Sequence, residues 1–154
     1  MIKYAAVLLV LIAGTGPRSE LFAKNYNLCH AASLSAVRKA GGQPYRAGMF
    51  ANRVCTWNRG DLQAGATLST HPAAAGAELI RSFLAQNGQQ GLAAKRIAVP
   101  GASQAVLVTL PAQPGHTTKN LFAAYRQGTI QVNVTAPGAV STARLVALMR
   151  LFAR

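Results

Sequence analysis

Acidic residues are scarce in this 154-residue chain, which has three Asp and Glu against 16 Lys and Arg. Catalysis by paired carboxylates needs two acids that flank a substrate. From Lys24 onward the chain has only Asp61 and Glu78. Asp61 lies in a predicted turn, and Glu78 lies in the middle of a predicted helix with Arg81 on the next turn. We interpret Asp61 as a turn former and Glu78 as half of a surface ion pair, and we expect no carboxylate-pair catalysis.

Other catalytic signatures are also missing. The sequence has no GxSxG nucleophile elbow and no GxxxxGK[ST] or GxGxxG phosphate-binding loop. Cysteine catalysis needs a free thiolate, which a disulfide would remove. A Ser-His-Asp arrangement could still be assembled from the serines, the histidines and Asp61, but no motif supports it. We therefore expect a protein that is not an enzyme.

Potential metal ligands are few and scattered. The chain has two cysteines without CxxC spacing, and its histidines are His30, His71 and His116. Structural and catalytic zinc sites need three or four ligands at characteristic spacings. We expect neither a metal site nor a cofactor.

Long apolar runs are absent except at the start of the chain. Lys3 precedes an apolar segment over 5–13, and the small residues Gly14, Thr15 and Gly16 follow. This order is typical of a secretory signal, and the run is shorter than the ~20 residues of a spanning helix. We predict a signal peptide over 1–16, with cleavage as late as residue 23, and a secreted, periplasmic or cell-wall protein without a stable membrane span. The alternatives are an uncleaved anchor and a buried helix.

The two cysteines, Cys29 and Cys55, can form one bridge. In an oxidising compartment disulfides persist, so export predicts a Cys29–Cys55 disulfide that closes a loop of about 26 residues. The alternative is a pair of buried free thiols.

Positive charge dominates the remaining 131 residues or so. From Lys24 onward 14 Lys and Arg face two acids, a formal charge of +12. Such a field attracts polyanions, including nucleic acid and anionic envelope polymers, but the charges are dispersed. The alternative is a generally cationic surface. Weak candidates for ligand binding are Trp57, Arg46, Arg53, Arg59, Lys95, Arg96, Lys119 and Arg126. The favoured interpretation of Trp57 itself is a core aromatic that packs on the disulfide.

Hydrophobic periodicity predicts one α+β domain over 24–154, with the order α-β-β-α-β-β-β-α. It would form an antiparallel sheet of about five strands with helices packed on it. Turn and cap signals separate the elements. The helices are expected at 29–40, 72–86 and 141–154, and the strands at 53–58, 62–70, 104–110, 121–126 and 129–135.

Several short motifs occur in the order seen in small exported domains of actinobacteria. They are Cys29 to Gly41, Cys55-Thr56-Trp57, Val99-Pro100-Gly101-Ala102, Gly128 to Thr135, and Ser141 to Phe152. The chain resembles this family, mostly lipoproteins of unknown function, and is distantly similar to extracellular sensor domains of mycobacterial membrane kinases. The resemblance implies a Cys29–Cys55 disulfide, a packed Trp57 and no catalytic residue. The lipobox cysteine typical of the family is missing here, so a lipid anchor is not expected.

We therefore expect an exported binding module that is not an enzyme. Its ligand would sit between the sheet and the loops 43–52 and 111–120. One alternative is a cationic protein that binds nucleic acid or an anionic cell-envelope polymer. Another is an inhibitor or immunity-type partner of a secreted enzyme.

Overall fold

A computed structural model describes residues 16–60 and 64–154. The predicted signal peptide over 1–16 lies almost wholly outside the described residues. The helices are α1 (Leu34–Gly41), α2 (Ala73–Ala85) and α3 (Thr142–Phe152), with short 3-10 helices at Ser19–Phe22 and Leu28–His30. The strands are β1 (Met49–Ala51), β2 (Val54–Asn58), β3 (Gly65–His71), β4 (Ala93–Arg96), β5 (Gln104–Thr109), β6 (His116–Tyr125) and β7 (Gly128–Pro137).

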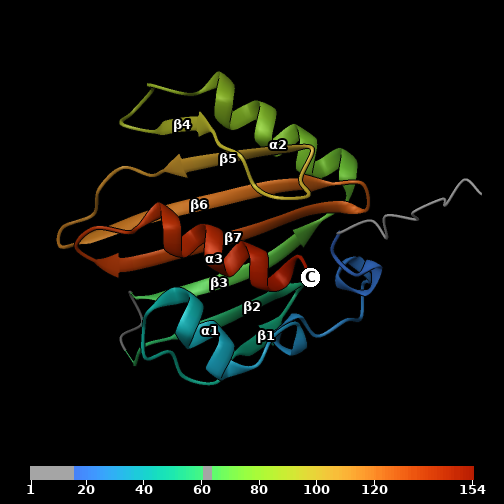
Figure 1. The fold of residues 1–154 in the computed structure, drawn as a ribbon. Helices are drawn as coiled ribbons and strands as arrows, with labels where there is room; N and C mark the ends of the chain where they lie inside the picture. The colour runs from blue at the N-terminus through green and yellow to red at the C-terminus, as the bar shows by residue number, and fades with distance from the viewer. Residues whose placement is uncertain (1–15, 61–63) are drawn as a thin grey trace, which may run out of the picture.

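The strands form one antiparallel sheet in the order β1-β2-β3-β7-β6-β5-β4 (Figure 1). The predicted α+β class and antiparallel sheet are confirmed, but the expectation of about five strands was too low. The additional strands, β1 and β4, lie at the two edges and contain three and four residues. Strands this short carry too few residues for an alternating pattern to emerge, so the sequence predicted a loop and a connector there.

The first helix and the hairpin also differ from prediction. Helix α1 begins at Leu34, after the Ser33 side chain accepts a hydrogen bond from the Ala36 amide, rather than at Cys29. Cys29 lies in a separate 3-10 turn. Strand β6 begins at His116 rather than at residue 121, because its polar first half pairs with β7 throughout.

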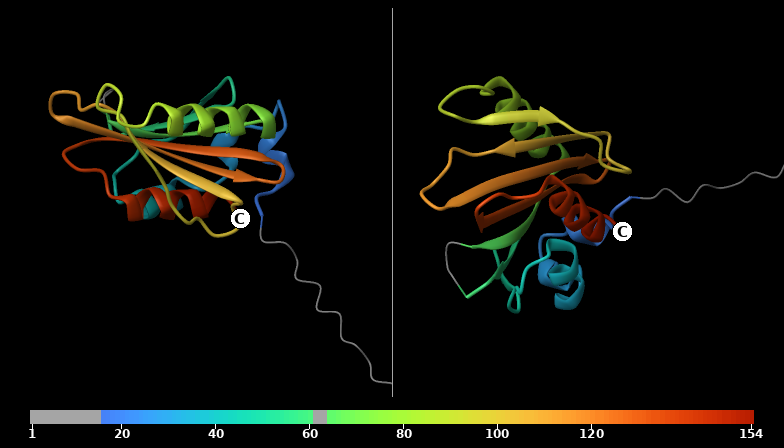
Figure 2. Two further views of the ribbon diagram at one scale, coloured as in Figure 1. Left: turned by 90° about the horizontal axis from the view of Figure 1, so that it is seen from above. Right: turned by 60° about the vertical axis from the view of Figure 1, so that its left-hand side comes forward.

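Helices cover both faces of the sheet. Figure 2 shows α1 and α3 on one face and α2 on the other. The α1–α3 face buries the larger core, which includes Leu68, Leu121, Ile130, Val132 and Leu145. The smaller core under α2 consists of Ile80, Ala94, Val106, Val108 and Phe122.

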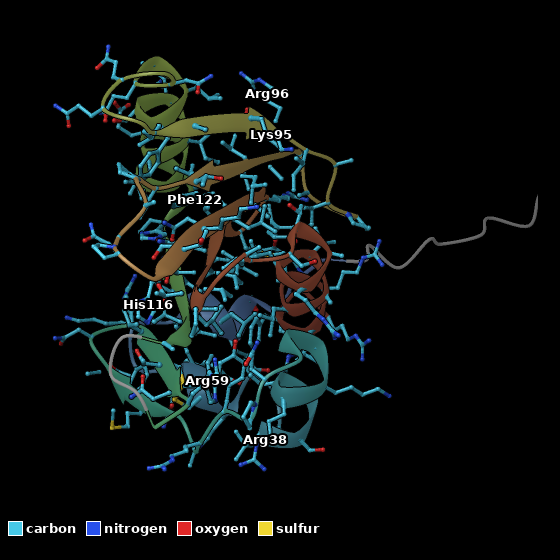
Figure 3. The ribbon with its side chains drawn as sticks, turned by 90° about the vertical axis from the view of Figure 1, so that its left-hand side faces the viewer. Arg38, Arg59, Lys95, Arg96, His116 and Phe122 are labelled. Atoms are coloured by element: carbon cyan, nitrogen blue, oxygen red, sulfur yellow. A yellow bond between two sulfur atoms is a disulfide. The ribbon has the colours of Figure 1, made fainter. Side chains whose placement is uncertain are left out.

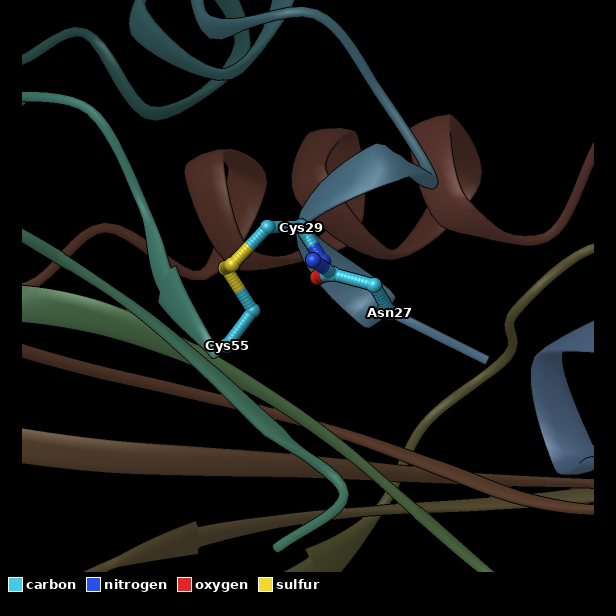
Figure 4. Close-up of a disulfide and its surroundings, with 3 residues drawn as sticks. All are labelled: Asn27, Cys29 and Cys55. Carbon is cyan, nitrogen blue, oxygen red and sulfur yellow. A yellow bond between two sulfur atoms is a disulfide. The ribbon is translucent and has the colours of Figure 1, made fainter. Parts of the chain in front are cut away.

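The larger core also contains the predicted disulfide, which is confirmed. Cys29 and Cys55 are bonded, with their Cα atoms 5.2 Å apart (Figure 4). A Cβ atom at Gly48 would lie 2.6 Å from Cys55 Sγ and 2.7 Å from Trp57 Nε1, so only glycine permits this close approach. The Trp57 ring stacks on Phe152 of α3 with centroids 5.6 Å apart. The bridge and the stacked rings together hold the 3-10 turn, β2 and α3 in one cluster.

Residues before Lys24 also belong to the folded unit. Leu21 is 1% exposed in the larger core, and its carbonyl accepts a hydrogen bond from Thr70 Oγ1. The compact part of the chain therefore begins upstream of the predicted boundary at residue 24. None of the helices in the described part of the chain is long and apolar enough to cross a membrane.

Candidate ligand-binding face

The strand alternation that builds the core also collects polar side chains on the opposite face. In one row across four strands, Thr56 pairs with Thr67, Thr67 with Asn133, and Asn133 with Asn120. Neighbouring rows add further hydroxyl, amide and imidazole groups. We call this surface the open polar face, and it consists of Thr56, Asn58, Thr67, Ser69, His71, Thr118, Asn120, Gln131, Asn133 and Thr135.

Helix α2 shares this side of the sheet and covers the other part of it. It packs on β4, β6 and β7, where Ile80 and Phe83 meet Phe122. Close approach at the start of the helix depends on Gly76, which sits directly against Thr129. The open polar face is therefore bordered on one side by the apolar residues of α2.

The amide side chains form a connected network. Gln131 Oε1 accepts hydrogen bonds from His71 Nε2 at 2.8 Å and from Ser69 Oγ at 3.2 Å. Gln131 Nε2 donates to Asn120 Oδ1 at 3.0 Å, and Asn133 Nδ2 donates to the same oxygen at 2.8 Å. Thr118 and Thr135 share a further hydrogen bond of 2.9 Å. Each bond fixes one side chain against its neighbour, so these groups are held in place before any ligand arrives.

Asn120 is the centre of the network and is 5% exposed. Its side-chain oxygen accepts twice, whereas its amide nitrogen has no hydrogen-bond partner among the described residues, and neither does Asn133 Oδ1. The network thus presents one donor group and one acceptor for a further polar partner.

A hollow of about 390 Å³ adjoins the face at the first half of β6. The described residues that line it are Gln113, Pro114, His116, Thr118 and Thr135. Its volume lies within the range of small-molecule pockets. Gln113 and Pro114, from the loop predicted over 111–120, border this hollow, whereas 116–120 belong to β6.

The loop 43–52, predicted to line the same cleft, is elsewhere. Tyr45 is buried in the larger core, and Gln43 lines a different hollow of about 210 Å³ together with Ser141 and Arg144. Within the described residues, the two loops do not enclose one site.

Formal charge is absent from the open polar face. Strands β2, β3 and β7 contain no Lys, Arg, Asp or Glu. Strand β6 contains only Lys119, which pairs with Val134 and so points to the α1–α3 side. Solvated sheet faces normally carry charged residues among their polar ones, and this chain has 16 cations available. The face offers neutral hydrogen-bonding groups and so suits an uncharged partner.

The eight candidate residues from the sequence do not gather on one surface, although the structure brings Arg46 next to the segment that carries Arg59. Trp57 is 2% exposed and lies in the core on the α1–α3 side, as its favoured interpretation predicted. Figure 3 shows Lys95 and Arg96 at one end of the molecule, on edge strand β4, and Arg59 and Arg38 toward the other end. Arg53 lies in the turn between β1 and β2, Arg126 in the turn between β6 and β7, and Arg46 beside Gly60.

Sequence reasoning missed the open polar face. The alternation of Gln131, Asn133 and Thr135 was visible in β7, but it identified only a surface-facing side. Ser69, which bonds to Gln131, lies 62 residues away from it in the sequence, so the network forms only when β3 pairs with β7. The local signal was the presence of two amides at alternate positions, Gln131 and Asn133.

The open polar face contains Ser69 and His71, residue types that can form a catalytic pair. Ser69 and His71 both bond to Gln131 rather than to each other. Within 16–60 and 64–154, no three His, Cys, Asp or Glu residues cluster so as to hold a metal ion.

No protein-family model matches this sequence, and no curated protein matches it at a significant level. The resemblance to exported actinobacterial domains thus stays a prediction. Fold and site define a disulfide-bonded α+β domain with a preorganised, uncharged sheet face.

Proposed function

We propose that this chain is an exported binding module without catalytic activity, and that its open polar face binds a neutral ligand rich in hydroxyl or amide groups. The observation that carries the proposal is the amide network centred on Asn120, which leaves a donor and an acceptor beside a hollow of about 390 Å³. Oligosaccharides and peptide backbones present such groups without formal charge.

The proposal of export has two supports. The pattern of 1–16 is that of a secretory signal, and the Cys29–Cys55 disulfide suits an oxidising compartment. The buried Leu21 favours cleavage at or before Gly16, because a cut after Ala23 would remove a core side chain.

The absence of catalysis is proposed on chemical grounds. The described carboxylates are Glu20 and Glu78, and Glu78 pairs with Arg81 on the exposed side of α2. The Nε2 atom of His71 bonds to the side-chain oxygen of Gln131, which is an amide oxygen and not a nucleophile. Binding groups are therefore present without an activated nucleophile beside them.

Nuclear magnetic resonance of the ¹⁵N-labelled, oxidised protein tests the proposal, because the side-chain amides of Asn120, Gln131 and Asn133 give their own signals. The probes are neutral oligosaccharides, namely N-acetylglucosamine oligomers and glucan oligomers, titrated to millimolar concentration. We expect at least one probe to shift these amide signals.

A matched pair of variants localises the effect. Thr67→Val removes a hydroxyl from the open polar face at constant shape, whereas Thr109→Val makes the same change on β5, on the opposite side of the sheet. Thr67→Val should weaken binding about 3- to 10-fold, the value of one neutral hydrogen bond, and Thr109→Val should not. Shifts confined to the α1–α3 side, or none with any probe, would reject a neutral saccharide on this face.

A further inference from the structure

We infer that a second surface, the groove between α1 and α3, binds a linear phosphate polymer. The groove lies on the side of the sheet opposite the open polar face, where the two helices run next to each other (Figure 1). It encloses about 510 Å³. Small side chains such as Ala36 and Ala147 line it together with four cations, Lys39, Arg144, Arg150 and Arg154.

No carboxylate side chain balances these cations in the described part of the chain. Glu20 lies in the 3-10 helix Ser19–Phe22, and Glu78 bonds to Arg81 on α2, across the sheet. Four like charges in one hollow repel one another, and an anion that enters would relieve this repulsion. The groove therefore has the charge of a site for an anionic partner.

Arg144 is held in position between the two helices. Its Nη1 donates to the Lys39 carbonyl at 3.2 Å, at the last turn of α1. Gly42 makes this possible, because it takes the left-handed conformation (φ +64°) and a Cβ atom there would lie 2.7 Å from Arg144 Cζ. The bond uses one of five guanidinium donors, so the others remain for a ligand.

The residue types and the shape favour phosphate. Arginine binds phosphate oxygens in a bidentate manner, and lysine adds a mobile point charge. The lining residues extend from Ala36 to Ala40 on α1 and from Arg144 to Leu151 on α3, about 6 and 10 Å along the helix axes, so the groove extends beyond a single phosphate. A linear polymer would contact several cations at once.

The groove also distinguishes between phosphate polymers. Proteins that bind single-stranded nucleic acid stack bases on aromatic side chains. Among the described residues that line this groove, none is aromatic. A phosphate polymer without bases, with polyol or simple phosphate linkages, is therefore the better match.

Binding of short-chain inorganic polyphosphate to the oxidised full chain tests this inference, measured by calorimetry between ~50 and ~500 mM salt. The groove variant Lys39→Gln/Arg150→Gln/Arg154→Gln keeps Arg144, whose bond joins the helices. We expect it to weaken binding at least about tenfold and to lower the salt slope by about 2, since each charge contributes ~0.7 in a flexible chain.

The matched control removes three exposed cations elsewhere, in Arg46→Gln/Lys95→Gln/Arg96→Gln. It should retain affinity within about threefold, because none of its residues lines the groove. Thermal unfolding of both variants establishes that they are folded. Equal losses in both, or no binding at ~50 mM salt, would overturn the inference. Oligo-dT that binds more tightly than polyphosphate would replace it with nucleic-acid binding.

Discussion

The face of the sheet under α1 and α3 is apolar, and a disulfide links its strand β2 to the 3-10 turn that contains Cys29. The opposite face, where α2 does not cover it, carries amides and hydroxyls. Both derive from the same strands. In β7, Ile130 and Val132 are fully buried on one side, while Gln131 and Asn133 are half-buried on the other. Most of the apolar area is buried on one side, and apolar burial is the dominant stabilising term. The other side is thereby free to hold polar groups that contribute less to stability.

Removal of the disulfide, which lies on the apolar face, should lower the free energy of unfolding more than any change on the open polar face. Cys29→Ala/Cys55→Ala frees a loop whose ends are 26 residues apart, which lowers the free energy of unfolding by about 3 kcal/mol in the chain-entropy description. Urea unfolding followed by fluorescence of Trp57, the single tryptophan, measures the loss. Trp57 lies next to the bridge and reports on the same cluster.

The double variant removes the packing of the two sulfur atoms as well as the bridge. Reduction of the wild-type protein with a thiol breaks only the bridge and is therefore the control. It should produce a loss similar to that of the double variant. A change below about 1 kcal/mol in both would mean that the α1–α3 side does not depend on the bridge.

Loss of the centre of the amide network should have a smaller effect. Asn120→Ala leaves Gln131 Nε2 and Asn133 Nδ2 without their acceptor, which costs about 1–2 kcal/mol because both donors are half-buried and can be partly rehydrated. The same urea unfolding measures it. Asn133→Ala is the matched variant, and since it removes one bond at the edge of the network, its cost should be about half as large. Equal stability of Asn120→Ala and wild type would show that the network is not formed in solution.

The sequence predicted the elements with strong local patterns. Helices α2 and α3 and strands β2, β5 and β7 lie close to their predicted ranges, because each has either a helical apolar stripe or a clear alternation. Strands β1 and β4 were missed because short edge strands are defined mainly by the neighbour to which they bond. The first half of β6, from His116 to Asn120, is polar on both sides and resembles a loop until its pairing with β7 is known.

The candidate site was harder to predict than the fold. The positive charge of the sequence led to the choice of Arg46, Lys95 and other dispersed cations as candidates. The hydrogen-bond network of the open polar face instead consists of neutral amides and their neighbours. The groove on α1 and α3 unites Lys39 with Arg150, residues 111 positions apart, through helix packing alone. Neither surface has a contiguous motif, so each depends on tertiary contacts that a single sequence does not reveal.

Substitution of Tyr125 should change the free energy of unfolding least, and it should raise rather than lower it. Its hydroxyl is buried without a hydrogen-bond partner among the described residues, and desolvation raises its pKa to about 12. Tyr125→Phe removes an unsatisfied polar atom and keeps the ring in place. We expect the free energy of unfolding to rise by about 0.5–1 kcal/mol at neutral pH, measured as before.

The pH dependence sharpens this prediction. Below pH ~10 the Tyr125 hydroxyl is protonated in both states, and its raised pKa has no effect on stability. As the pH rises from ~10 toward 12, the unfolded state loses this proton more readily than the folded state, so the wild-type protein loses stability. Tyr125→Phe should lose less stability over this interval than wild type, and its absorbance titration at alkaline pH should lack the tyrosine that ionises near pH 12. Tyr45→Phe is the comparison, since burial also raises the pKa of Tyr45 while nearby Arg59 opposes the rise. If Tyr125→Phe instead costs about 1 kcal/mol or more, the hydroxyl is hydrogen-bonded in solution, and the polar groups of the α1–α3 side are as well satisfied as those of the open polar face.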